Sequence, residues 1–344
     1  MNIWNLIKEI KYYLRLEGFS RPFKKFLLYQ SPLSKIVNTN LYNKTYMKRI
    51  KKRAGKIQPK FLQVETTNGC NARCLMCPHT CMKRKVKVMS LEDFKKVLDN
   101  VMKNYDIEVL TMHGFGEPFF DKGILDKIAY ANKRYPRLKI DMATNAGLMT
   151  KEKADGLLKL KLWRLTFSIN GWEGNYKEVM GIDYETTKRN ALYFMKKKKA
   201  MKNPVLVNVS MMILKENEKD FEKYSKFWRK YADSVRGYFP SDWAGELRQN
   251  LGEQKIPYDR KQWPCTAPWT HIVIHSRGEF IVCVRDFESS VQFGNLIKGD
   301  DIKELRNSKK FKDFQRQHLN FDFSSPVCKN CDHAYDSSIE WWLW

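Results

Sequence analysis

Six short apolar segments alternate with charged segments of helical length between residues 61 and 239. The apolar segments have the length and composition of strands, and the first of them ends just before a run of cysteines. Strands separated by helices form parallel sheets with right-handed crossovers, so the pattern predicts an α/β fold. The predicted strands span 61–67, 108–114, 139–145, 164–170, 206–213 and 234–239, and the predicted helices span 90–105, 122–134, 150–160, 184–202 and 218–232.

The composition divides the chain of 344 residues into three predicted domains. Residues 1–58 form a basic helical extension. Residues 59–245 form a partial (β/α)6, TIM-like barrel, in which the chemistry collects at the carboxyl ends of the strands. After residue 240, Pro, Trp and Gly become frequent. Residues 246–344 are therefore predicted to form a small C-terminal domain, with a hairpin at 271–284 that turns at 276–278 and a helix near 301–316.

The N-terminal extension holds about half of the net charge of +25, because residues 1–60 contain fifteen Lys or Arg and two acids, Glu9 and Glu17. Its apolar residues recur at near-helical spacing, which is typical of a basic amphipathic helix that binds an anionic membrane surface. A solvated helix packed on the barrel is the alternative. The apolar positions are Trp4, Leu6, Ile7, Ile10, Tyr13 and Leu14.

The sequence contains neither a membrane-span pattern nor a secretion-signal pattern. No apolar run reaches 18 residues, and Lys8, Glu9, Lys11 and Arg15 interrupt the N-terminal apolar segment. We therefore expect a cytoplasmic protein, either free or peripheral at the inner face of the membrane. The eight cysteines are then not expected to form disulfides, because thiols stay reduced in the cytoplasm, and their two separated groups suggest two metal sites.

Cys70, Cys74 and Cys77 follow the first predicted strand at spacings of four and three residues. Three thiolates in one loop can hold three irons of a [4Fe–4S] cluster and leave the fourth iron open to a small ligand. Cys81 is spaced too tightly to act as a fourth ligand and is predicted to be a bystander thiol. A zinc site that includes His79 is the alternative.

A CxxxCxxC motif with an apolar residue before its third cysteine, directly after a first barrel strand, resembles the radical S-adenosylmethionine (SAM) superfamily. The resemblance implies that the open iron chelates SAM through its amino nitrogen and carboxylate, and that Met76 lies near the adenine. Residues 113–118, HGFGEP, resemble the family's GGEP motif, with Phe115 between the two glycines. Hydrogen bonding to loop backbone is the alternative role for the polar residues. The resemblance assigns SAM binding to Met76, Gly114, Gly116, Glu117, Pro118, Thr144, Asn145, Ser168 and Asn170, with Asn217 as a weaker candidate.

The other four cysteines lie late in the chain, where two distant thiols are followed by a CxxC pair. Three chain segments can close one cluster in this way, and the surrounding sequence resembles the SPASM/twitch domains of radical SAM enzymes. The resemblance implies an auxiliary [4Fe–4S] cluster held by Cys265, Cys283, Cys328 and Cys331. A structural zinc ribbon is the alternative.

The cysteine spacing resembles that of 2-deoxy-scyllo-inosamine dehydrogenase-type enzymes, which oxidise a ring alcohol to a ketone. The resemblance implies a radical SAM oxidoreductase that cleaves SAM reductively and takes a hydrogen atom from a sugar-like or cyclitol substrate, lipid- or nucleotide-linked forms included. Oxidation or epimerisation would follow. An external donor such as flavodoxin or ferredoxin would supply the electron. The general base is left open among Arg248, Arg285, Asp286 and His271, and Tyr238 and Trp243 either line the pocket or pack against the fold.

Two other function classes remain. One is a radical SAM maturase that modifies a peptide or protein side chain, although residues 1–58 are short for the leader-binding module common in that group. The other is a non-enzymatic protein that binds metal or nucleic acid through its basic charge. This class does not explain why the motifs fall at successive strand ends, so nucleic acid is disfavoured as a partner.

Overall fold

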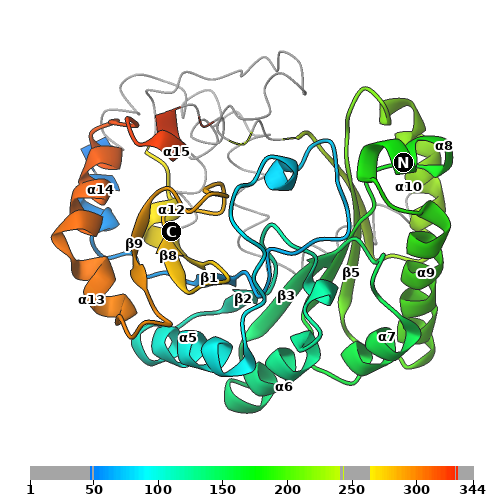
Figure 1. Cartoon of the computed structure of the whole chain (residues 1–344), viewed down its shortest axis with the longest axis horizontal. Helices are drawn as coiled ribbons and strands as arrows, with labels where there is room; N and C mark the ends of the chain where they lie inside the picture. The colour runs from blue at the N-terminus through cyan, green and yellow to red at the C-terminus, as the bar shows by residue number, and fades with distance from the viewer. Residues whose placement is uncertain (1–46, 49, 241–242, 244–263, 330, 332–344) are drawn as a thin grey trace.

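The computed structural model describes residues 47–48, 50–240, 243, 264–329 and 331. These residues build a nine-stranded sheet in the order β6-β5-β4-β3-β2-β1-β7-β8-β9 (Figure 1). Strands β1 to β7 pair in parallel, and β8 and β9 continue the sheet in antiparallel fashion. The strands are β1 (Phe61–Val64), β2 (Val109–Thr111), β3 (Lys139–Thr144), β4 (Arg164–Ser168), β5 (Leu206–Met212), β6 (Ser234–Tyr238), β7 (His271–Ile274), β8 (Glu279–Ile281) and β9 (Gln292–Asn295).

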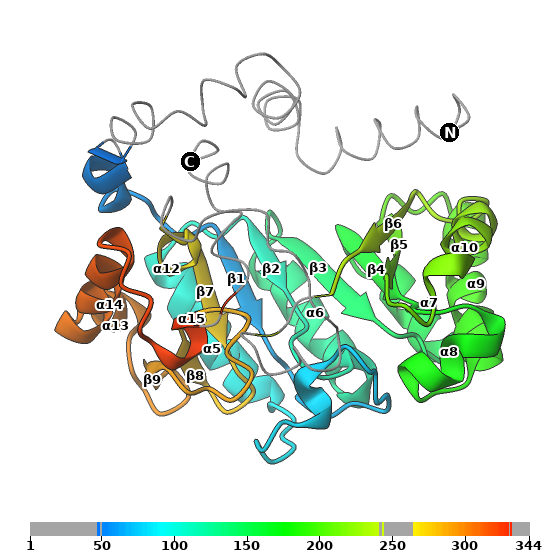
Figure 2. The ribbon, with the colours of Figure 1, turned by 90° about the horizontal axis from the view of Figure 1, so that it is seen from above.

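Helices cover the outer face of this curved sheet (Figure 1). Figure 2 shows α13 and α14 at one end of the molecule and α8 to α10 at the other. The α-helices are α5 (Leu91–Asn104), α6 (Ile124–Arg134), α7 (Lys151–Leu158), α8 (Glu173–Met180), α9 (Tyr184–Ala200), α10 (Phe221–Trp228), α12 (Ala267–Thr270), α13 (Ile302–Asn307), α14 (Lys309–Leu319) and α15 (Pro326–Lys329), and the 3-10 helices are η1 (Pro78–Thr80), η2 (Pro118–Phe120) and η3 (Glu218–Asp220).

The parallel α/β fold, with six strands of which the first five are each followed by a helix, and the C-terminal hairpin are confirmed. Local signals start the helices where expected: the Ser90 hydroxyl accepts a hydrogen bond from the Asp93 N–H, and the Thr150 hydroxyl accepts one from Lys153. The buried faces of strands and helices form one large apolar core, which runs from Leu62 on β1 to Phe311 on α14. The core therefore extends from the barrel into the C-terminal part of the chain.

Strands β1 and β2 end at Val64 and Thr111, before the predicted ends at 67 and 114, and the helices differ from the sequence prediction in three places. The predicted helix 301–316 is two helices, because Ser308 adopts an extended conformation and its hydroxyl caps α14 by accepting from the Phe311 N–H. The predicted helix 218–232 begins with the 3-10 turn η3 and ends at Trp228. Helix α8 was not predicted, since its eight residues are too few for a clear helical period and include Gly174 near the start.

Strand β7 lies beside β1 in parallel register, with Phe61 opposite His271 and Val64 opposite Ile274. The C-terminal hairpin therefore extends the barrel sheet. The predicted domain boundary between residues 245 and 246 falls outside the described residues and stays a prediction. Of the predicted extension, residues 1–46 also fall outside them; Ile50 and Ala54 pack against Trp269 in a small apolar cluster. No helix in the described ranges combines the length and the hydrophobicity needed to cross a membrane.

Lys127 on α6 forms a buried ion pair with Asp121, with 2.7 Å between Nζ and Oδ2 and both side chains 2% exposed. Lys127→Met is expected to lower the free energy of unfolding by about 3–5 kcal/mol, because it leaves a carboxylate without its counter-charge in the core. Urea denaturation measures this loss. The control is Lys309→Met, since Lys309 is 91% exposed and its pair with Asp313 is worth under about 1 kcal/mol. Equal losses in both variants would contradict the expectation.

Candidate active site

A cavity of about 440 Å³ opens at the carboxyl ends of strands β1 to β6. Eleven of the residues predicted from the sequence line it, although they come from four separate chain segments. Parallel strands carry their carboxyl ends to one edge, which is why these segments meet. The lining includes Cys70, Cys74, Met76, Cys77, Gly114, Gly116, Glu117, Thr144, Asn145, Ser168 and Asn170.

The first cysteine loop is anchored by the unpredicted helix α8. The Arg73 N–H donates to the Met180 carbonyl, and the Leu75 N–H donates to the Val179 carbonyl, both at 3.0 Å. Gly181 then ends α8 with a φ of +69°, a conformation that favours glycine, and a Cβ atom there would lie 3.2 Å from the backbone nitrogen of Arg73. Helix α8 thereby fixes the loop that presents the three thiols.

The three cysteines are half-buried and line the same cavity. Burial raises the pKa of Cys70, Cys74 and Cys77, in the case of Cys77 to about 11, and the neighbouring thiols raise that of Cys74 further. When a thiol with a raised pKa binds a metal, the metal cation displaces the thiol proton and the sulfur binds as a thiolate. Among the described residues no three His, Cys, Asp or Glu side chains converge tightly enough for a single metal ion. In an iron–sulfur cluster each thiolate binds a different iron, and the three cysteines that line this cavity supply such thiolates, so these residues fit such a group.

Cys81 and His79 lie outside this cavity lining. Cys81 is exposed, and its Sγ–H donates to the Pro78 carbonyl at 3.2 Å. The His79 Nε2 lies 2.9 Å from the carbonyl oxygen of Asn68 and donates to it. Both side chains therefore serve the turn that follows the motif.

Glu117 connects the ends of β2 and β3. Its buried carboxylate accepts hydrogen bonds from the Thr144 hydroxyl at 2.6 Å and from the Asn145 N–H at 2.7 Å. Burial raises the pKa of Glu117, and these hydrogen bonds oppose that rise. Pro118 begins η2 and is buried beside the cavity lining. Glu117 thus positions Thr144 and Asn145 at the cavity.

Asn170 and Asn217 brace the loops after β4 and β5. The Asn170 Oδ1 accepts from the Met212 N–H at 2.8 Å, and its Nδ2 lies 3.3 Å from the Met180 sulfur. Asn217 is fully buried and donates to the carbonyls of Asn170 and Met212. Asn217 is therefore a loop-bracing residue outside the cavity lining, which matches the backbone-bonding alternative.

Aromatic residues form the outer part of the cavity. Tyr238, Phe239 and Trp243 line it, and Phe239 is 79% exposed. The Trp243 indole N–H donates to the Met76 carbonyl at 2.8 Å, and its ring meets Phe115 edge-to-face at 5.5 Å. Both Tyr238 and Trp243 therefore line the pocket in addition to packing.

A second cavity, of about 140 Å³, is lined by the four late cysteines. Burial raises the pKa of Cys283 to about 12, and burial together with Cys283 and Cys331 raises that of Cys328. The four-thiol donor set fits an iron–sulfur cluster or another thiophilic metal. Val284 and Arg285 line both cavities, so the two sites adjoin.

The four candidates for a general base occupy different places. Arg285 lines both cavities, whereas His271 lines the second and stacks on Phe61. The Asp286 carboxylate accepts hydrogen bonds from the Ser290 and Val291 N–H groups and so holds its own loop. Arg248 falls outside the described residues.

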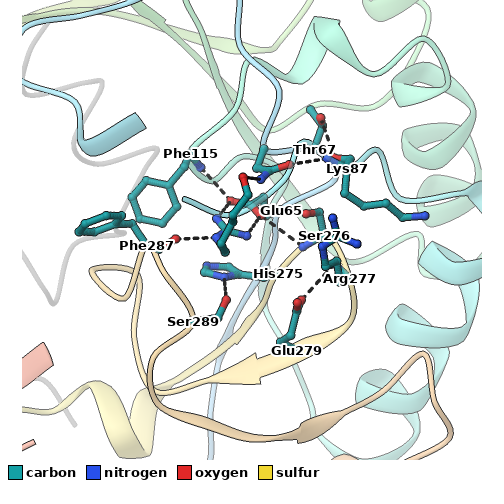
Figure 3. A network of polar contacts seen from close by, with 12 residues as sticks. Glu65, Thr67, Lys87, Phe115, His275, Ser276, Arg277, Glu279, Phe287 and Ser289 are labelled. Carbon is teal, nitrogen blue, oxygen red and sulfur yellow. Dashed lines mark hydrogen bonds and ion pairs between the residues drawn. The ribbon is translucent and has the colours of Figure 1, made fainter. Parts of the chain in front are cut away.

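Sequence reasoning missed Glu65, which follows β1. Its carboxylate is fully buried and pairs with both terminal nitrogens of Arg84, at 2.8 and 2.9 Å (Figure 3). Burial by itself would raise the pKa of Glu65. The nearby His275 and Arg84 and the hydrogen bonds that the carboxylate accepts outweigh burial and lower this pKa to about 2. The sequence does contain a signal for Glu65: it is an acidic residue at the carboxyl end of an apolar strand, and functional sites of parallel sheets lie at such strand ends.

Two family models match the chain. The model of the radical SAM superfamily matches residues 64–227, and the model of the SPASM iron–sulfur cluster-binding domain matches residues 265–332. The chain is 24% identical over 174 residues to a tungsten-containing aldehyde ferredoxin oxidoreductase cofactor-modifying protein of Pyrococcus furiosus, a match that covers 49% of this chain and 48% of that protein. The chain thus spans about half the length of this relative.

A longer match covers 79% of the chain and 92% of the SAM-dependent 2-deoxy-scyllo-inosamine dehydrogenase of Niallia circulans, with 19% identity over 280 residues. Among solved structures, SuiB of Streptococcus suis bound to its precursor peptide SuiA is similar with a TM-score of 0.63 and 14% identity. That match covers 89% of this chain and 82% of SuiB. At this identity the structural likeness concerns the fold.

Proposed function

Because the chain belongs to the radical SAM superfamily and carries a C-terminal SPASM domain, we propose that it oxidises a sugar-like or cyclitol alcohol by a radical mechanism. The observation that carries the proposal is the pair of adjoining cysteine-lined cavities, which share Val284 and Arg285. A substrate between them would lie near both cofactors. The match to the 2-deoxy-scyllo-inosamine dehydrogenase, which covers 79% of this chain and 92% of that protein, supports this substrate class.

In this proposal Cys70, Cys74 and Cys77 hold the cluster that binds SAM, and the four late cysteines hold the auxiliary cluster. When bound, these cofactors supply a 5′-deoxyadenosyl radical and an acceptor for one electron. With that chemistry supplied, loss of a hydrogen atom from the alcohol carbon, followed by loss of a proton and an electron, would give the ketone. The electron that starts each turnover comes from an external donor such as flavodoxin or ferredoxin.

The chain's own residues bind and orient the reactants. Gly114 and Gly116 line the cavity and let their loop pack directly on Glu65 and on the backbone that precedes Cys70, while Glu117 holds Thr144 and Asn145 at the cavity where SAM would bind. The packed rings of Phe115 and Trp243 exclude water from the inner cavity. The volume of about 440 Å³ lies in the range of small-molecule sites.

The test is anaerobic reconstitution followed by strong reductant and SAM. We expect about eight irons per chain and release of 5′-deoxyadenosine. A cyclitol deuterated at the reacting carbon is expected to transfer deuterium into deoxyadenosine and to appear as a ketone. Zinc in place of iron, or an absence of deoxyadenosine, would refute the proposal. Deuterium transfer from a labelled peptide instead of a cyclitol would favour the maturase alternative.

Contact of residues 1–58 with an anionic membrane surface is a separate proposal supported by their basic charge. Flotation of the full chain with anionic vesicles, compared with a chain lacking residues 1–58, tests it. Binding of the full chain alone supports the proposal, and equal recovery of both chains with the vesicles contradicts it.

A further inference from the structure

One carboxylate, that of Glu65, joins its own segment of the chain to three others (Figure 3). Glu65 accepts hydrogen bonds from Arg84, from the Phe115 N–H at 3.1 Å and from the Ser276 N–H at 3.3 Å. These partners come from the segment after the cysteine motif, the loop after β2 and the turn between β7 and β8. A buried carboxylate that accepts hydrogen bonds from all of these donors fixes the positions of the three segments relative to one another.

Arg84 carries the connection into the C-terminal domain. Its Nε–H donates to the Phe287 carbonyl, and the preceding N–H, of Lys83, donates to the Glu288 carboxylate at 2.6 Å. Phe287 and Glu288 belong to the segment 283–291, here named the Cys283 loop, which also carries Arg285. Arg84 thus bridges Glu65 and the Cys283 loop with different nitrogens of one planar group.

The SAM-facing loop, residues 113–117, rests on the same pair. A Cβ atom at Gly114 would lie 2.8 Å from the Cβ of Glu65, so the loop packs directly on this side chain. The Phe115 ring lies 5.9 Å from the Arg84 guanidinium and meets Phe287 edge-to-face at 6.1 Å. Phe115, which interrupts the glycine pair of the motif, is therefore the contact between the two loops.

We propose that Arg84 is a positioning residue that holds the SAM-facing loop and the Cys283 loop at a fixed separation. The inference rests on the proposed function, in which these loops belong to the SAM site and to the auxiliary cluster. A planar guanidinium can bind a carboxylate with two nitrogens and a carbonyl with the third, whereas the ammonium of Lys places one charge on a flexible stem. Arg84→Lys keeps the charge and removes the bridge.

The experiment compares Arg84→Lys with Arg164→Lys in iron-loaded protein. Arg164 binds Asp141 through two nitrogens at 2.7 and 2.6 Å between β3 and β4, and so offers a similar pair away from the Cys283 loop. Hydrogen exchange of residues 113–117 and 283–291, the SAM dissociation constant and the EPR spectrum of the auxiliary cluster are measured in each variant. The spectrum is recorded with Cys70, Cys74 and Cys77 replaced by Ala.

For Arg84→Lys we expect faster exchange in both loops, SAM binding weakened at least tenfold and an altered auxiliary-cluster spectrum. Arg164→Lys is expected to lower the melting temperature without these changes. If Arg84→Lys also lowers only the melting temperature, Arg84 has a structural role and the inference is wrong. Glu65→Gln gives an independent variant, with the same expected pattern. Because exchange is measured without turnover, this result is separate from wild-type deoxyadenosine formation, which tests the proposed function.

Discussion

Replacing Cys70, Cys74 and Cys77 together with Ala is expected to abolish formation of 5′-deoxyadenosine from SAM and to leave about four of about eight irons per chain. The three thiols line the larger cavity, and the late cysteines line a separate one, so loss of the first set leaves the second intact. Iron analysis and chromatography of the reaction with strong reductant measure both effects.

Cys81→Ala is the matched control. This thiol is exposed and bonds to the Pro78 carbonyl, so its removal is expected to preserve iron content and SAM cleavage. SAM cleavage by the triple variant would show that the cavity cysteines do not hold the active cluster. Loss of cleavage in Cys81→Ala would show that the bystander assignment is wrong.

Gly116→Ala is expected to have the second largest effect. An added Cβ would lie 2.3 Å from the Thr67 carbonyl oxygen and 2.7 Å from that of Gly69, both backbone atoms that cannot turn away. The loop after β2 must then move away from the cysteine loop, which displaces Glu117 and the residues it holds. We expect a loss of about 1–3 kcal/mol in the free energy of unfolding and at least tenfold weaker SAM binding.

Gly174→Ala on α8 is the control, because nothing lies within 4 Å of the added Cβ. Alanine favours the helical conformation over glycine, so this variant should be as stable as the wild type or more stable by up to about 1 kcal/mol. Denaturant titration measures the stability and calorimetry of iron-loaded protein measures SAM binding. Normal SAM affinity in Gly116→Ala would contradict the role given to this close approach.

Much of the site followed from local pattern. The cysteine spacing and the polar residues after successive strands predicted eleven cavity residues, because alternating strands and helices bring the strand ends to one edge. Pro118 and Asn217 share that edge but lie outside the lining, since η2 buries one and loop carbonyls bind the other. A position at a strand end therefore predicts that a residue lies near the cavity. The conformation of the turn that follows the strand decides whether its side chain lines the cavity.

The sequence by itself determined the element order, the six parallel units and the two cysteine sets, because strand composition, helix caps and ligand spacing are local properties. Only the tertiary structure decided that β7 pairs with β1, that α8 anchors the cysteine loop and that Glu65 meets Arg84 and Ser276. Glu65 and Ser276 are 211 positions apart. Such contacts form between segments that are distant in the sequence, and they depend on how buried charges and apolar side chains pack throughout the core. No short segment of the sequence determines that packing.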